Sequence, residues 1–502
     1  MSFRSVVPML CASMNGLDLA IIVAYLVGTT LFGCSFLFRK HGGGDAEGFT
    51  TGSGKLPTWT VALSIFATHV SSIAFLGLPA KAFLTNWNPY VLSLTVPIAA
   101  AVAAVWFVPF YRRSGNVSAY SFLEGRYGVW ARLYGSACFL VMQSARSGVI
   151  LFLMALLIHT LTGWSTVSVI LVTGAATTVY SLMGGLSAVV WTDAIQSLIL
   201  IVGTVLCLVV LGFAIPDFGG GLSAAFDAGK FSLGSFSVAD WSGETFWVIF
   251  VYAMFINLQN FGIDQSFTQR YVAAKSQGAA AKSLLTSGFL YLVNTALFVL
   301  IGTFLWMYVR AHPGTVPDEV LAKADAVFPW FIVHRLPTGV SGLLVAAIIA
   351  AAMSTVSATL NSGATVLLAD YWKRFAPKRT NARTDIAFLR LATAGLGLFA
   401  MAVGVGVMNV QSALTAFWAI QSVLSGGMLG LFLLAMLCRR TRGAHAAVAT
   451  ALGIAVIAWV TFGQAWTGFS FRLHVNLAIV LGTLALVTTG AALSVFAKGK
   501  SK

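Results

Sequence analysis

The chain has 502 residues, of which 58% are hydrophobic and only 9% are charged. Soluble domains carry about 25% charged residues, so the composition excludes an ordinary soluble protein and predicts one polytopic membrane domain over residues 1–502. The net charge of +15 does not indicate nucleic-acid binding, because most of the 30 Lys and Arg, among them Arg132, Arg270 and Arg374, fall in loops on one side of the predicted spans. By the positive-inside rule this side is cytoplasmic, which places the N-terminus outside and the C-terminus inside.

Thirteen membrane-spanning helices are predicted from apolar runs long enough to cross a bilayer core of about 30 Å. In chain order they cover residues 15–38, 57–83, 88–111, 133–161, 164–184, 192–214, 243–268, 283–309, 333–371, 386–408, 411–437, 445–467 and 474–497. The ninth run is long, so a short external helix is expected around 328–335. The two longest loops, 215–242 and 310–332, are predicted on the outer side. Residues 1–13 lack the apolar run of a signal peptide, and either Met1 or Met14 can be the start.

Several classes of function lack their sequence signals. There is no GxxxxGK[ST] phosphate loop and no HExxH motif, and the five cysteines show no metal-binding spacing. The chain is therefore predicted not to be an enzyme. A channel would need a continuous polar lining, whereas polar interruptions are confined to a few spans. A transport-derived sensor would carry a signalling domain, so secondary transport is favoured.

The second span contains a polar interruption, in IFATHVSSIAFLGLPAKAF (65–83). Ser and Thr side chains compete for backbone hydrogen bonds, and Pro79 removes one amide, so local unwinding is expected. Free carbonyls at membrane depth are tolerated only where they line a cavity or coordinate something. The segment is therefore either part of a cation site or a packing surface of small polar residues.

The ninth span offers matching oxygens, in AAIIAAAMSTVSATLNSGATVLLADYW (346–372). Its hydroxyl and amide residues, Ser354, Thr355, Ser357, Asn361 and Ser362, occupy an arc of roughly 160° on one helix face. Hard oxygen ligands suit an alkali cation, and no soft ligand is offered to a transition metal. A packing stripe is the alternative.

Arg146 lies near the centre of the fourth span, where an unpaired guanidinium costs several kcal/mol. Its partner is either a substrate carboxylate or an acid such as Asp193 or Asp264. His69 either contacts substrate, reports pH or is a neutral, hydrogen-bonded core residue.

Four segments resemble signature stretches of the sodium:solute symporter family: SAYSFLEGRYG (118–128), YSLMGGLSAVVWTDAIQ (180–196), NLQNFGIDQSFTQRYVAAKS (257–276) and AAAMSTVSATLNSGATV (350–366). The likeness covers roughly residues 15–440. It implies a LeuT-type fold of two inverted five-helix repeats, at 57–214 and 243–437. Residues 15–38 would form an extra first helix, and residues 445–497 two C-terminal helices. The leading span of each predicted repeat is interrupted by polar residues and glycine, as inverted-repeat transporters require.

The resemblance implies a sodium site made by the carbonyls of Ala67, Val70 and Ala351 and the hydroxyls of Ser354 and Thr355. A second sodium site of some members falls on Asp193 and Ser357, but its third position is Ala358, which has no hydroxyl. In the sialic-acid branch the substrate carboxylate is held by groups that correspond to Ser71, Ser72 and Arg146. The other predicted substrate-binding residues, some of which depart from the family pattern, are His69, Ser93, Asn257 and Asn260.

The predicted function is sodium-coupled import of a small polar, carboxylate-bearing solute across the inner (plasma) membrane by alternating access. A sialic-acid-like compound, another sugar acid or a monocarboxylate would fit. Sodium is the co-transported ion, and no obligatory protein partner is expected. The alternatives are a sodium-coupled symporter of a neutral sugar or polyol and a proton-coupled symporter on the same fold.

Overall fold

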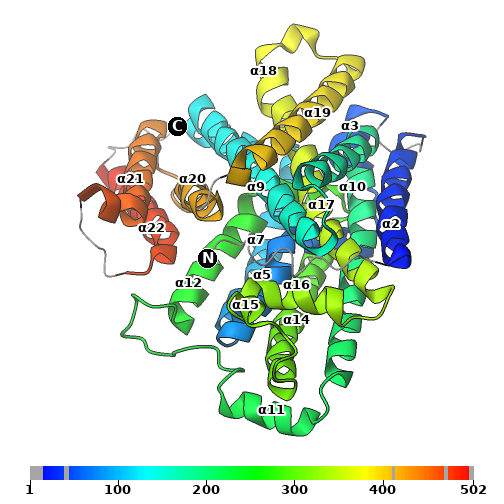
Figure 1. The fold of residues 1–502 in the computed structure, drawn as a ribbon. Helices are drawn as coiled ribbons and strands as arrows, with labels where there is room; N and C mark the ends of the chain where they lie inside the picture. Colours follow the sequence, from blue (N-terminus) through cyan, green and yellow to red (C-terminus); the bar gives the residue numbers. More distant parts are fainter. Residues whose placement is uncertain (1–14, 39–43, 410–412, 468–472, 497–502) are drawn as a thin grey trace.

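The computed structural model describes residues 15–38, 44–409, 413–467 and 473–496 (Figure 1). Over these residues the protein is helical, and the only β-type pairing is an isolated bridge between Leu56 and Ala274. The all-α prediction is confirmed. Within the described part of the chain, ten helices are long and apolar enough to cross a membrane, and an eleventh span is formed if one sharply bent helix pair is counted.

The long helices follow one another along the whole chain. Their bounds are α2 Gly16–Cys34, α7 Val96–Ser114, α9 Val129–Thr162, α10 Thr166–Phe213, α12 Phe246–Ile263, α14 Gln277–Ala311, α17 Val340–Val366, α19 Ala382–Gly406, α20 Ala413–Leu437, α21 Gly443–Thr467 and α22 Ala478–Phe496. Shorter helices connect or interrupt them: α3 Ala46–Thr51, α4 Thr58–His69, α5 Ser72–Leu84, η4 Asn88–Tyr90, α6 Val91–Leu94, α8 Ser121–Tyr127, α11 Phe218–Asp227, α13 Gln265–Ala273, α15 Asp318–Leu321, α16 Ala324–His334, the π-helical η5 Leu367–Trp372 and α18 Lys373–Phe375.

Two connections differ from the sequence prediction. The predicted fifth and sixth spans are joined without a loop in α10, which has 48 residues and turns sharply at Gly185 (φ 57°, ψ −152°). Only glycine adopts this conformation readily, and a Cβ there would lie 2.6 Å from the Cα of Phe49. The predicted loop 215–242 contains α11, whose first turn is capped by the side chain of Asp217.

Two spans are broken in the middle. Helices α4 and α5 are bent by 58° across the residues between them. Val70 and Ser71 are extended there (ψ 127° and 158°). Ser71 caps the start of α5, because its hydroxyl accepts a hydrogen bond from the backbone amide of Ala74. Helices α12 and α13 meet at Asp264, which is also extended and whose carboxylate caps α13 through Ser266 (2.7 Å). The polar interruptions predicted for the leading span of each half are therefore breaks in the backbone.

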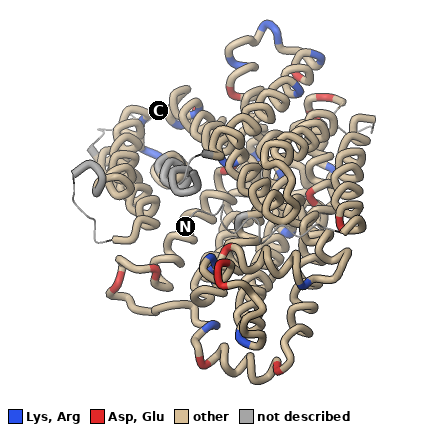
Figure 2. Tube along the Cα trace, in the orientation of Figure 1, with Lys and Arg blue, Asp and Glu red and all other residues tan. Residues whose placement is uncertain are grey.

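Helix α17 lies at the centre of the bundle and packs against α10, α9, α2 and α19. The span that contains it is 94% buried, whereas those of α2 and α19 are 28% buried. Helices α20, α21 and α22 stand to one side, with α20 packed against α9 (Figure 1). Most charged residues lie near the two ends of the bundle, which leaves a largely uncharged middle for lipid (Figure 2).

A network of ion pairs ties α8 and α9 to the end of α17. Arg132 contacts both Glu124 (2.9 Å) and the buried Asp370 of the π-helical turn (2.6 Å), and Arg374 contacts Glu124 (2.6 Å). The hydrogen bond from Arg132 is the main cause that holds the pKa of Glu124 below its usual value. Ser118 also donates to Asp370 (2.8 Å). This end of the bundle is therefore closed by charged contacts between sequence-distant segments.

Candidate functional site

The five predicted sodium ligands form one cluster. The Ser354 hydroxyl lies 3.1 Å from the carbonyl oxygens of both Ala67 and Ala351. The Thr355 hydroxyl lies 3.1 Å from the same Ala351 carbonyl and 3.5 Å from that of Val70. All five residues are buried. Three carbonyls and two hydroxyls thus converge from α17 and the α4–α5 break, which is the hard-oxygen donor set that suits an alkali cation.

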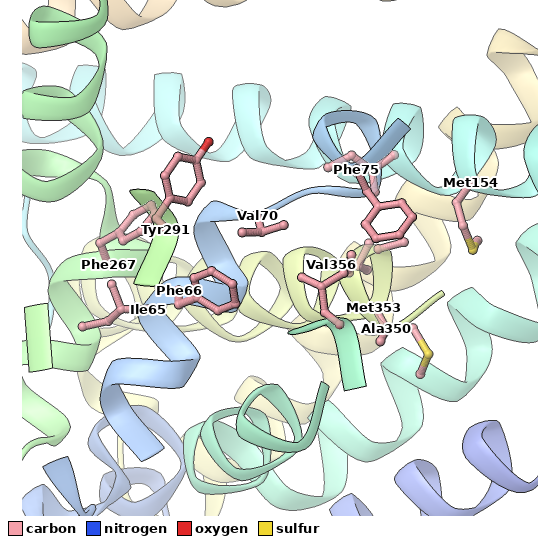
Figure 3. Packing of buried hydrophobic residues seen from close by; sticks show 14 of the residues in the cluster. Ile65, Phe66, Val70, Phe75, Met154, Phe267, Tyr291, Ala350, Met353 and Val356 are labelled. Carbon is pink, nitrogen blue, oxygen red and sulfur yellow. The ribbon is translucent and has the colours of Figure 1, made fainter. Parts of the chain in front are cut away.

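The break between α4 and α5 makes the carbonyls of Ala67 and Val70 available. The last hydrogen bond of α4 runs from the amide of Val70 to the carbonyl of Phe66, and α5 begins with its own cap at Ser71. The carbonyls of Ala67 and Val70 then face the hydroxyls of α17. Figure 3 shows Val70 on the extended link between the helices that carry Phe66 and Phe75.

A cavity of about 320 Å³ lies next to this cluster. Four predicted substrate residues line it: His69, Ser71, Ser93 and Arg146. Its other lining residues are Ala74, Gly77, Leu78, Pro89, Leu92, Val149, Ile150 and Tyr291. The cation cluster and the cavity share the broken segment, because Val70 supplies an oxygen to the cluster and the next residue, Ser71, faces the cavity.

Arg146 has no ion pair within 4 Å among the described residues. The two acids proposed as structural partners are engaged elsewhere. Asp193 pairs with Arg270, and Asp264 caps α13 and accepts a hydrogen bond from Gln143. The Arg146 side chain instead lines the cavity on α9. Asp264 lies within electrostatic range of Arg146 but forms no ion pair with it, so the guanidinium can bind an anion in the cavity.

Three aromatic residues pack around the ring of His69. Its ring centroid is 4.2 Å from that of Tyr291, 5.2 Å from that of Phe261 and 5.6 Å from that of Phe267. Its ring also lies within electrostatic range of Arg146. His69 therefore forms part of the cavity wall between the aromatic residues and the guanidinium.

Three predicted substrate residues do not line this cavity. Ser72 is buried in the first turn of α5, and its hydroxyl has no hydrogen-bond partner in the described structure. The amide of Asn257 donates to Thr95 (2.9 Å), which ties α12 to the start of α7. Asn260 lies on α12 and is partly buried. Their predicted contacts with substrate remain predictions.

Asp193 and Ser357, the predicted second cation site, adjoin a guanidinium. Arg270 donates to the Asp193 carboxylate (2.9 Å) and to the Ser64 hydroxyl (2.7 Å), and Ser64 donates to the same carboxylate oxygen (2.6 Å). Arg270 is 1% exposed and lies within helix α13, so its placement in a loop is wrong. It lies on α13, whose polar face is buried against α4 and α17. The acid already has a cationic partner.

Tyr291 and Arg270 are the site residues that sequence reasoning missed. Tyr291 lies in an otherwise ordinary apolar helix, α14, and its neighbours in the chain give no signal of a cavity. Arg270 follows a polar run, IDQSFTQR, that could have indicated a buried segment instead of a span end. Its burial follows from the packing of α13, which begins after the break at Asp264, against α4 and α17.

Comparison with known proteins agrees with this arrangement. The sodium:solute symporter family matches residues 49–453. The sodium/sialic acid symporter SiaT of Proteus mirabilis is 28% identical over 481 residues, which cover 94% of each chain. NanT of Aliivibrio fischeri, also a sodium/sialic acid symporter, is 29% identical and covers 95% of this chain and 93% of its own. The human sodium-coupled monocarboxylate transporter 1 is 27% identical over 89% of this chain and 73% of its own.

Solved structures give the same fold. A substrate-bound, outward-open Na⁺-coupled sialic acid symporter superposes with a TM-score of 0.88 at 27% identity, covering 96% of this chain and 98% of its own. Mhp1, a nucleobase-cation-symport-1 family transporter, superposes with a TM-score of 0.56 at 14% identity, covering 89% of this chain and 94% of its own. The second likeness concerns the fold alone.

Proposed function

Because the chain belongs to the sodium:solute symporter family, we propose that it imports a small carboxylate-bearing solute together with sodium. Sodium binds at the cluster of Ala67, Val70, Ala351, Ser354 and Thr355. The carboxylate binds Arg146, assisted by Ser71, Ser93 and His69. The observation that carries the substrate class is the Arg146 guanidinium, which lines the cavity and has no ion pair among the described residues.

Coupling follows from the segment that the two sites share. Sodium bound to the carbonyls of Ala67 and Val70 fixes the link between α4 and α5, and the link in turn positions Ser71 in the cavity. An ion that raises substrate affinity by some factor has its own affinity raised by the same factor. The membrane potential adds about 2.3 kcal/mol per charge per 100 mV to the driving force.

We further propose thirteen membrane crossings. To the ten long apolar helices are added the bent α4–α5 pair, the second half of α10 after Gly185 and helix α20. The breaks at Val70 and Asp264 then fall in the leading spans of two repeats, at 57–214 and 243–437, as an inverted-repeat transporter requires. The first helix and the last two lie outside these repeats. The N-terminus would lie outside the cell and the C-terminus in the cytoplasm, by the bias of the basic residues.

The second sodium site is proposed to be absent. Asp193 is neutralised by Arg270, and Ala358 supplies no hydroxyl next to Ser357. A second sodium would have to bind the other oxygen, Oδ1, of a carboxylate whose charge Arg270 already balances, which weakens the attraction for a cation. One sodium per cycle is therefore expected.

The two alternative functions, transport of a neutral sugar or polyol and coupling to protons, would each need a different chemistry at the site. A neutral sugar or polyol would leave Arg146 unpaired in a closed site, which is costly. Proton coupling would need a titrating group at the cation cluster, and its five residues supply only carbonyls and hydroxyls.

Uptake into proteoliposomes separates these functions. Labelled carboxylates, a neutral hexose and a polyol would be offered under inward gradients of sodium, potassium, choline or protons. Carboxylate uptake that requires the sodium gradient is expected. Equal uptake when a proton gradient replaces sodium would contradict the proposal, as would sodium-driven uptake of the hexose in preference to every carboxylate.

A further inference from the structure

The cavity has one polar end and one apolar end. On α9, Arg146 is followed one turn later by Val149 and Ile150. On α5, the capping residue Ser71 is followed by Ala74, Gly77 and Leu78. On the segment of η4 and α6, Pro89 and Leu92 precede Ser93. The polar residues gather beside the helix break: the His69 ring is 4.2 Å from that of Tyr291 and within electrostatic range of Arg146, and Ser93 lies beside Tyr291.

A second cavity identifies the side to which the apolar end leads. This cavity, of about 630 Å³, shares Leu78, Pro89 and Leu92 with the first. The shared residues all belong to the apolar end, and the second cavity is lined beyond them by polar groups such as Lys81, Glu244 and Asn476. The apolar residues therefore form a neck between the outer part of the site and the guanidinium.

We infer, on the basis of the proposed function, that the substrate is a carboxylate with an apolar body, and not a polyhydroxylated sugar acid. The carboxylate lies at Arg146, and the body fills the neck formed by Leu78, Leu92 and Ile150. None of the described side chains that line this neck can accept or donate a hydrogen bond. A substrate hydroxyl held there loses water without a replacement, which disfavours a polyol.

The volume sets the size of this solute. At about 30 Å³ for each water, 320 Å³ holds roughly ten waters, so this cavity takes about ten non-hydrogen atoms of the solute. Short aliphatic or aromatic acids have this size. The relatives named as sialic acid symporters are similar in fold, but fold does not decide the ligand.

Four acids and one amide test the inference with purified full-length protein in nanodiscs. Binding of hexanoate, 2-hydroxyhexanoate, gluconate and N-acetylneuraminate would be measured by calorimetry in sodium and again in potassium. Hexanoate and gluconate have the same carbon chain and carboxylate but differ by five hydroxyls. In 2-hydroxyhexanoate the hydroxyl lies beside the carboxylate, at the polar end. Hexanamide lacks the charge and reports the role of Arg146.

Hexanoate and 2-hydroxyhexanoate are expected to bind in sodium about 100-fold more tightly than gluconate, because apolar pockets reject a buried hydroxyl by about this factor. The variant Leu92→Asn should reduce the ratio of hexanoate to gluconate affinity, because the asparagine would offer substrate hydroxyls a hydrogen-bond partner in the neck. Leu94→Asn, on the same short helix but outside the cavity lining, should leave it unchanged.

The outcomes separate the two proposals. If gluconate or N-acetylneuraminate binds within tenfold of hexanoate in sodium, the apolar-body inference is wrong although sodium-coupled carboxylate transport stands. If hexanamide binds as tightly as hexanoate, or if no acid binds more tightly in sodium than in potassium, the proposed function fails and the inference with it.

Discussion

The sodium cluster makes the most exact prediction, for the variants Ser354→Ala and Thr355→Val. Each removes one of the five oxygens and leaves the backbone carbonyls in place. A contact between a neutral polar group and a charge contributes about 1.5–3 kcal/mol. At 1.4 kcal/mol per factor of ten, each variant should weaken sodium binding roughly 10- to 150-fold.

The matched control is Thr359→Val, one turn further along α17. The Thr359 hydroxyl donates to the carbonyl of Thr355 (3.0 Å) within its own helix and does not touch the α4–α5 break. The variant Thr359→Val removes a threonine hydroxyl from the same buried helix as Thr355→Val does. It therefore reports the general effect of losing a hydroxyl from α17. Its sodium affinity should stay within about twofold of the parent protein's.

Sodium titrations of uptake in proteoliposomes provide the assay. The half-saturating sodium concentration should rise for the two cluster variants, and at saturating sodium their maximal uptake should recover. Substrate half-saturation should rise at low sodium only, because linkage transmits the lost ion affinity to the substrate site. An unchanged sodium requirement in Ser354→Ala, or an equal shift in Thr359→Val, would refute the assignment of the cluster.

Three further predictions concern the charged residues. Arg146→Gln should abolish carboxylate binding while sodium alone still raises the denaturation temperature, and loss of both effects would indicate a structural role instead. Uptake should depend on sodium with a Hill coefficient near one, since Asp193 is paired with Arg270. A coefficient near two would contradict the proposed absence of a second sodium site. Asp370→Asn should destabilise the protein by about 1–3 kcal/mol because the Arg132 guanidinium loses its buried partner and keeps only Glu124, whereas Lys81→Ala, which breaks a half-exposed pair, should change the denaturation temperature little.

The break in the second span could be predicted because its causes are local. Thr, Ser and Pro within a short apolar stretch compete with or remove helical hydrogen bonds, and the structure places the break at Val70 and Ser71. The hydroxyl face of α17 could be predicted from helical periodicity alone. That both meet in one cluster required the family resemblance, because nothing local pairs residue 67 with residue 354.

The placement of Arg270 shows where charge counting fails. The positive-inside rule assigns a basic residue near a span end to the cytoplasmic loop, and it holds on average over many residues. Arg270 does not lie in such a loop, because it belongs to α13, which begins after the break at Asp264, and it pairs with an acid on α10. The sequence contains both charges, but Arg270 and Asp193 are 77 residues apart and meet only through the packing of two helices. Tyr291 was missed for the same reason, since only the packing of α14 against α4 brings it to His69.

The arrangement explains why ion and substrate need not touch in order to be coupled. An intact α4–α5 helix would use the carbonyls of Ala67 and Val70 for its own hydrogen bonds and would have no extended residue to present at Ser71. Breaking the helix exposes both features at once, and each is unfavourable in a membrane until it finds a partner. In the proposed site, sodium would supply a partner for the carbonyls and fix the backbone one residue away from the cavity. Part of the free energy of sodium binding is then used to order the substrate site. Without sodium, the entropy cost of ordering this site lowers the substrate affinity.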